Sequence, residues 1–202
     1  MIQIFIQELI GAVGQLLIFT AIPFLVWLIW GREKEKFFKY LGLVKGKSES
    51  DVKIVLITVT ACACYIGAFV LALNVLKDDV TAAGSTFAGQ GMKALLAAVV
   101  YAFIRTGLSE EIIFRGFIGK RIASKWGFAV GNTVQAILFG LLHGVPFGLA
   151  NGRILVAIIM TVLPGAMGWY MGWLDEKKYN GSIIPGWITH GVMNFLTIVI
   201  NL

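Results

Sequence analysis

The sequence is poor in charged residues. They make up 14% of its 202 residues, against roughly 25% in ordinary soluble domains, while hydrophobic residues make up 58%. Mean hydropathy is +0.83, and apolar runs of about 20 residues, enough to cross ~30 Å of hydrocarbon, recur along the chain. This composition excludes a soluble globular protein and indicates a membrane protein.

Cysteine and histidine are also scarce, with two of each. Cys62 and Cys64 lie two residues apart in an expected helix, so they face nearly opposite sides and suit neither a disulfide nor a metal clip. We interpret them as small packing residues. His143 and His190 both lie in apolar stretches, where costly ionisable side chains usually line a cavity and have a function.

Several protease signatures are missing. The sequence has no His-Glu-x-x-His, no Gly-x-Ser-x-Gly elbow, and no cysteine near a histidine in a motif. Two histidines and a glutamate are a known zinc ligand set, but here they come from three separate helices, so their spacing gives a metal no support. We therefore expect neither a metal nor another cofactor.

We expect an all-α, polytopic membrane bundle of about six transmembrane helices, forming a single integral membrane domain over residues 1–202. The expected spans cover approximately residues 4–30, 53–76, 93–117, 130–144, 154–174 and 183–202. The first run is too long for a signal-peptide core and follows no positive charge, so we interpret it as a retained helix. Gly144–Gly148, with Pro146, is expected to stop the fourth span, which would be short, broken or re-entrant.

The basic residues indicate an orientation. Twelve of the 17 Lys and Arg residues fall at the turns after the first, third and fifth spans, whereas the alternate turns carry only Lys77, Lys93 and Arg153. The positive-inside rule puts the first set of turns in the cytoplasm and both termini outside the cell membrane. Residues 31–52 would then be a basic cytoplasmic linker with a short helix, and Lys77–Gln90 a polar external loop. The formal charge of +6 thus indicates a lipid bilayer partner and no nucleic acid.

Three short patterns place polar side chains in these apolar stretches. They are Glu-Glu-x-x-x-Arg (Glu110, Glu111, Arg115), Phe-x-x-x-His (Phe139, His143) and His-x-x-x-Asn (His190, Asn194). Each pattern is spaced for one helical face. The glutamates precede the expected turn at Trp126-Gly127 by about 16 residues and His143 follows it by about 16, which puts them at matching heights in a hairpin. We expect one shared site, close to the cytoplasmic face.

Each pattern alone also has a structural explanation. Glu111 and Arg115 are consistent with a buried ion pair, and Arg115 also with snorkelling to the interface. His190 and Asn194 fit hydrogen bonds between helices, and Phe139 fits packing better than chemistry. Together the patterns favour function, because the second glutamate is not needed for an ion pair and the chain has no other histidine.

Without a nucleophilic side chain, the remaining route to peptide hydrolysis is water activated by a carboxylate and an imidazole. An Asn194 amide N–H and a His190 ring N–H would stabilise the resulting oxyanion.

In their order on successive membrane helices, the three patterns resemble the CPBP family. These are the CAAX prenyl proteases and bacteriocin-processing enzymes, also called the Abi family, which are intramembrane glutamate endopeptidases. The similarity covers roughly residues 90–202, the expected catalytic core, and includes Gly116 and Gly140. The two helices and linker of residues 1–76 carry no motif.

The resemblance implies a role for each residue of the patterns. It makes Glu110 the principal base, which shares a catalytic water with His143. Glu111 would support Glu110 and pair with Arg115, while the His-x-x-x-Asn pair forms the side that stabilises the oxyanion. No metal is required in this scheme.

The implied substrate is a peptide or protein at the membrane, and the sequence leaves open whether it carries a lipid. The chain is shorter than the eukaryotic prenyl-protein endopeptidases it resembles. This favours the small prokaryotic branch, which is linked to bacteriocin or other precursor processing and to self-immunity. Two alternatives stay open: a non-catalytic immunity or scaffold protein, and a carrier or channel, which the lack of an internal repeat disfavours.

Overall fold

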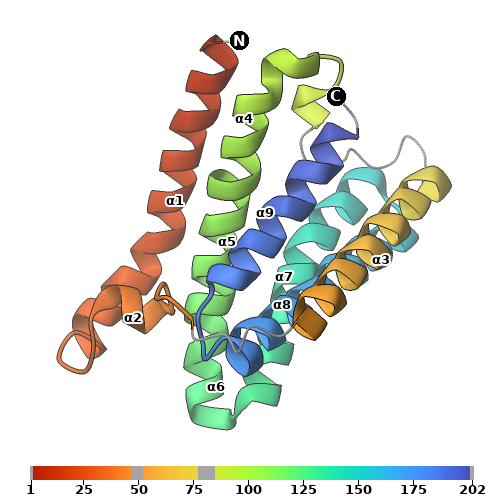
Figure 1. The fold of residues 1–202 in the computed structure, drawn as a ribbon. Helices are drawn as coiled ribbons and strands as arrows, with labels where there is room; N and C mark the ends of the chain where they lie inside the picture. Colours follow the sequence, from red (N-terminus) through yellow and green to blue (C-terminus); the bar gives the residue numbers. More distant parts are fainter. Residues whose placement is uncertain (1, 47–51, 77–84, 201–202) are drawn as a thin grey trace.

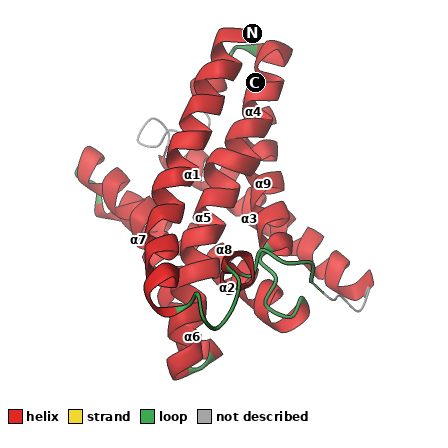
Figure 2. Ribbon diagram, turned by 90° about the vertical axis from the view of Figure 1, so that its left-hand side faces the viewer, coloured by secondary structure: helices red, strands yellow, loops and turns green. Residues whose placement is uncertain are grey.

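The computed structural model describes residues 2–46, 52–76 and 85–200, and every regular element in those ranges is helical (Figures 1 and 2). The long helices are α1 (Ile2–Trp30), α3 (Val52–Leu76), a composite helix (Gly91–Trp126), α7 (Phe128–Asn151), α8 (Ile154–Trp173) and α9 (Ile184–Val199). All but α9 are long and apolar enough to cross a membrane. The 16 residues of α9 rise about 24 Å at 1.5 Å per residue. The predicted all-α polytopic bundle is confirmed.

The composite helix is not a regular α-helix. It consists of η3 (Gly91–Ala94), α4 (Leu95–Val99), η4 (Val100–Leu108), α5 (Ser109–Glu111), η5 (Ile112–Gly119) and α6 (Lys120–Trp126). Both η4 and η5 are π-helical, so i→i+5 turns enclose the three-residue α5 that carries the two glutamates. Such turns are rare and frequently occur at functional sites.

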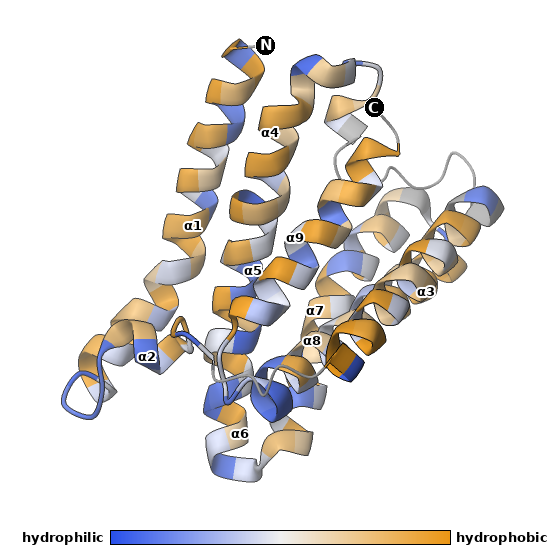
Figure 3. Ribbon diagram, in the orientation of Figure 1, coloured by the Kyte–Doolittle hydropathy of each residue, from blue (hydrophilic) through white to orange (hydrophobic). Residues whose placement is uncertain are grey.

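The composite helix lies between α1 on one side and α9 on the other, and α7 and α8 form a closely packed hairpin (Figure 1). Helix α3 lies against α8 and α9. Helix α1 begins and α9 ends at the same end of the bundle, whereas α2 (Phe37–Leu41) and α6 lie at the other end (Figure 1). Hydrophobic residues cover most of α1 and α3, and hydrophilic residues gather around α6 (Figure 3).

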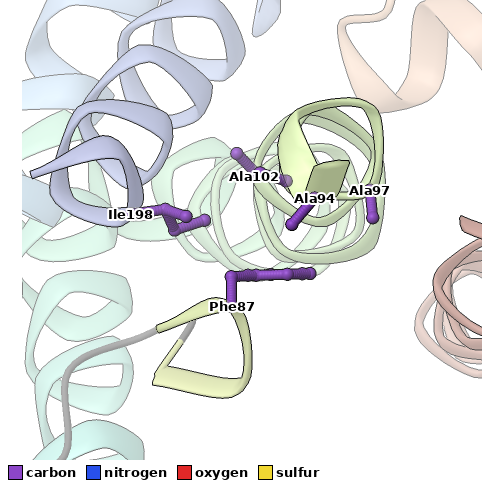
Figure 4. Packing of buried hydrophobic residues seen from close by; sticks show 6 residues of the cluster. Phe87, Ala94, Ala97, Ala102 and Ile198 are labelled. Atoms are coloured by element: carbon purple, nitrogen blue, oxygen red, sulfur yellow. The ribbon is translucent and has the colours of Figure 1, made fainter. Parts of the chain in front are cut away.

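A hydrophobic cluster, mostly of alanines, lies toward the end of the bundle that is away from α6. Phe87, in the turn η2 (Ser85–Phe87), is completely buried between the alanines of the composite helix and Ile198 of α9 (Figure 4). The members are Phe87, Ala94, Ala97, Ala98, Ala102 and Ile198. Because alanine takes little space, the Phe87 ring reaches the surface of the composite helix and packs it against α9.

The expected end of the fourth span is wrong. Helix α7 continues through Pro146 to Asn151 and is neither broken nor re-entrant. Gly140 and Gly144 face α8 so closely that a Cβ on either would collide with Thr161. This glycine stripe packs α7 on the α8 backbone, and such packing lets a membrane helix tolerate the hydrogen bond that proline removes.

Most other expectations from the sequence hold where the structure describes them. The turn after the third span lies at Gly127, where φ is +84°. The linker contains a short helix, α2, although residues 47–51 lie outside the described ranges. Most of the expected external loop, residues 77–84, also lies outside them. Cys62 and Cys64 are free; Cys62 is half-buried, whereas Cys64 is exposed and does not have the packing role expected for it.

Candidate active site

The three sequence patterns meet at one cavity of about 340 Å3 inside the bundle. Its polar wall combines residues of the composite helix, α7 and α9, namely Glu110, His143, His190 and Asn194. Helices distant in sequence therefore contribute one set of acidic, imidazole and amide groups, at the matching heights that equal path lengths predicted.

Glu111 is the buried centre of this set, with no exposed surface. Its Oε1 atom lies 3.2 Å from Arg115 Nη1 and 2.9 Å from His190 Nδ1. Arg115 is 3% exposed and its guanidinium lies 4.3 Å from the centre of the Phe139 ring, so it does not snorkel to the interface. Phe139 also packs against both histidine rings, which supports the packing role expected for it.

Glu110 faces the cavity and keeps 14% of its side chain exposed. Its Oε2 atom lies 3.6 Å from His190 Nε2 and 4.0 Å from His143 Nε2, and it has no hydrogen-bond partner among the described residues. A separation of 4.0 Å is too long for a direct hydrogen bond but is easily bridged by one water molecule.

A contact at Nδ1 orients each of the two imidazole rings. His143 Nδ1 lies 2.8 Å from the Phe139 carbonyl oxygen, which only accepts hydrogen bonds. Nδ1 therefore carries the proton, and in the neutral ring Nε2 is left as a base directed at Glu110. His190 Nδ1 donates in the same way to Glu111, so its Nε2 donates only when the ring is an imidazolium.

Asn194 is oriented by a residue that the sequence patterns missed. Its Nδ2 donates to Thr106 Oγ1 at 2.9 Å, and the Thr106 hydroxyl in turn donates to the Tyr101 carbonyl at 2.9 Å. One amide N–H of Asn194 is spent on Thr106, and the other remains for the cavity. Thr106 lies four residues before Glu110, and this spacing is the only signal in the sequence that could have indicated it.

Polar residues outside the patterns also lie at membrane depth. Arg105 donates to Glu8 of α1 at 2.8 Å, and Gln15 of α1 donates to Ser109 at 3.1 Å. These pairs attach α1 to the composite helix beside the glutamates. No pattern reasoning found them, because each partner is a single polar residue in an apolar run.

Methionines and aromatic rings form the apolar wall of the cavity. Met160, Met167 and Met171 contribute from α8, whereas Tyr65 and Phe69 contribute from α3, with their rings stacked at 6.1 Å. Flexible methionine side chains adapt to irregular apolar groups. Within the described residues, no three His, Cys, Asp or Glu side chains are arranged to hold a metal ion.

Comparison with curated proteins and with solved structures found no match for this chain. A family model described as Rce1-like, type II CAAX prenyl endopeptidase, matches residues 92–196, which is just over half of the chain and includes all three patterns. Together with the five apolar helices, this match identifies a multi-pass membrane protein, and the family implies protease activity on a membrane-associated protein substrate. The chain therefore belongs to the Rce1-like family of type II CAAX prenyl endopeptidases.

Proposed function

We propose that the protein is a metal-independent, glutamate-type endopeptidase that cuts a membrane-associated peptide or protein, with residues 90–202 as its catalytic core. The observation that carries the proposal is the position of Glu110 Oε2, which faces the cavity 4.0 Å from His143 Nε2. This pair brackets a point within hydrogen-bonding reach of both atoms, where a nucleophilic water would be held.

In the proposed reaction, the water oxygen attacks the scissile carbonyl carbon while Glu110, assisted by His143, takes the water proton. The carbonyl π electrons move to the carbonyl oxygen. When the tetrahedral intermediate collapses, the C–N bond breaks and the stored proton passes to the leaving amine. The products are a carboxylic acid, which then gives its proton to the amine or to water, and an amine, so one water molecule balances the reaction.

The oxyanion is stabilised by the free N–H of Asn194 and by a His190 ring N–H, which Nε2 can supply when it carries a proton. Glu111 holds the His190 ring in this role, because its carboxylate accepts the Nδ1–H of that ring at 2.9 Å. Arg115, 3.2 Å from Glu111, pairs with that carboxylate and holds it in place within the bundle. The site thus separates a proton-accepting side from an oxyanion-stabilising side.

We further propose that the methionine-lined wall holds an apolar group of the substrate next to the scissile bond. The positive-inside rule places the site close to the cytoplasmic face and both termini outside the cell. A precursor of a bacteriocin or of another small exported peptide fits this location, with or without a lipid.

The test is a comparison of membrane peptides by mass spectrometry in cells that express the wild type or Glu110→Ala. We expect an uncut precursor to accumulate with the variant. In detergent, the wild type should cut an internally quenched peptide ending in S-farnesylated Cys-aliphatic-aliphatic-Ser, or the accumulated precursor, and Glu110→Ala should lose about 100- to 10,000-fold in rate.

Glu33→Gln is the matched control, because Glu33 is exposed in the α1–α2 turn. Full activity of an inserted, folded Glu110→Ala would refute the proposal. Bacteriocin protection that survives Glu110→Gln, without any cleavage, would instead support a non-catalytic immunity protein.

A further inference from the structure

Asp175 is a buried acid that none of the three patterns includes and that the proposed reaction does not use. It lies in η6 (Leu174–Lys178), at the end of α8, and is 1% exposed. A carboxylate with so little contact with water needs strong partners, because an isolated buried charge is costly. The contacts of Asp175 therefore have to offset the cost of burying its carboxyl group.

One partner is the first turn of α9. Asp175 Oδ1 accepts a hydrogen bond from the Gly186 backbone N–H at 2.7 Å. The first N–H groups of a helix lack partners within the helix, and a negative charge there is favourable. The residue before α9, Ile183, makes no side-chain cap, so Asp175 provides the cap from another helix.

The cap lies on the same face of α9 as the proposed catalytic ring. Gly186 and His190 are four residues apart, so one turn of helix separates the Asp175 contact from the Glu111 contact. The fit at the cap is close: a Cβ at Gly186 would lie 2.5 Å from Asp175 Oδ2 and 2.9 Å from Oδ1. Glycine at this position lets the backbone reach the carboxylate.

The other side of Asp175 faces Arg115 across a cavity of about 10 Å3, which Gln135 also lines. Among the described residues, Asp175 Oδ2 and Gln135 Oε1 have no hydrogen-bond partner, and Arg115 makes no hydrogen bond besides its ion pair with Glu111. One water molecule fits such a volume, and it can accept from Arg115 and donate to both oxygens. Asp175 also lies within electrostatic range of Glu111, Arg115 and Lys120.

We infer that Asp175 is a positioning residue for the proposed peptidase reaction. It fixes the start of α9, and so the place of His190 and Asn194, relative to the Glu111–Arg115 pair. Asp175 contacts the Gly186 N–H and Glu111 contacts His190 one turn later, so the two acids hold α9 at successive turns. The inference rests on the proposed function, since it concerns geometry that matters only if His190 and Asn194 act on the substrate.

The test compares Asp175→Ala, which removes the cap, with Asp175→Asn, whose Oδ1 still accepts from Gly186. The probe is the internally quenched S-farnesylated peptide, or the precursor that accumulates with Glu110→Ala. Because a displacement of about 1 Å can cost about 100-fold in rate, we expect Asp175→Ala to lower kcat about 10- to 100-fold with KM unchanged. Asp175→Asn should restore most of the rate.

Gly186→Ala keeps the carboxylate but displaces it, and should reproduce the kcat loss. Glu176→Gln is the matched control, because Glu176 is the adjacent acid and its pair with Lys120 is partly exposed; its rate should stay within about twofold. In a double variant, Asp175→Ala should add clearly less than its own single loss to His190→Ala, since part of its effect acts through the same ring.

Hydrogen exchange provides a readout without substrate. Amides at the start of α9 should exchange faster in Asp175→Ala and at the wild-type rate in Asp175→Asn. Unchanged kcat or unchanged exchange in a folded Asp175→Ala would overturn the inference, and so would additive losses with His190→Ala. If Glu110→Ala is also fully active, the proposed function itself fails; if Glu110→Ala is inactive, only the role of Asp175 fails.

Discussion

Glu111 Oε1 lies 2.9 Å from His190 Nδ1, while the neighbouring Glu110 places its Oε2 3.6 Å from Nε2 of the same ring. Two acids adjacent in sequence thus contact opposite nitrogens of one imidazole. One is buried and holds the ring, and the other faces the cavity. This division of labour is the basis for the different consequences expected when each acid is changed.

Replacing Glu111 should destabilise the protein as well as inactivate it. Glu111→Gln leaves Arg115 buried without its 3.2 Å counter-ion, and breaking a buried pair costs about 3–5 kcal/mol. We expect a lower unfolding temperature in detergent together with loss of cleavage. Glu33→Gln should change neither property. Wild-type stability of Glu111→Gln would show that the pair contributes little to the fold.

Replacing Thr106 should slow the reaction and leave the fold intact. Thr106→Val keeps the shape of the side chain but removes the oxygen that accepts from Asn194 at 2.9 Å. An unanchored amide stabilises the oxyanion less well, and we expect about a tenfold lower kcat with little change in KM or unfolding temperature. Thr106→Ser, which keeps the hydroxyl, should retain activity. A Val variant as fast as the wild type would argue against Asn194 as an oxyanion donor.

The glycine stripe of α7 should be intolerant of even a methyl group. A Cβ at Gly144 would collide with Thr161, so Gly144→Ala should force α7 and α8 apart at a cost of about 1–3 kcal/mol. Gly14→Ala is the matched control, because nothing lies within 4 Å of a Cβ at Gly14 of α1. Unfolding in detergent, followed by circular dichroism, compares the two. Equal stability would mean that the α7–α8 contact is looser than described.

Removing metal ions should leave cleavage unchanged, because the proposed reaction uses only side chains and water. The measurement is the cleavage rate after dialysis against EDTA or 1,10-phenanthroline, with a zinc metalloprotease as the positive control for chelation. Loss of activity that zinc restores would contradict the metal-independent mechanism.

The features that sequence reasoning predicted are those that regular spacing controls. Equal path lengths about Gly127 correctly put Glu110 and His143 at one height, and i,i+4 spacing correctly paired Glu111 with Arg115. The predicted end of α7 was wrong because glycine and proline need not stop a membrane helix where a neighbouring helix covers its backbone. Gly144 is covered by α8, which the local sequence cannot reveal.

The remaining parts of the site depend on tertiary contacts. Asp175 acts through a single hydrogen bond to another helix and has no characteristic spacing, whereas Thr106 has only its four-residue distance from Glu110. The π-helical turns around Glu110 and Glu111 also escape a 3.6-residue pattern, because they change the number of residues per turn. Sequence reasoning therefore found the groups with chemistry but not the groups that orient them.

Tyr65 and Phe69 line the cavity from α3, which lies outside residues 92–196 that the family model matches. The apolar wall proposed to hold the substrate is therefore encoded partly outside the stretch that carries the proposed catalytic groups. On the proposed function, we expect substitutions at Tyr65 or Phe69 to change which peptides are cut without altering any proposed catalytic group. Exchange of α3 between relatives, with the core kept constant, would show whether this helix sets the selectivity.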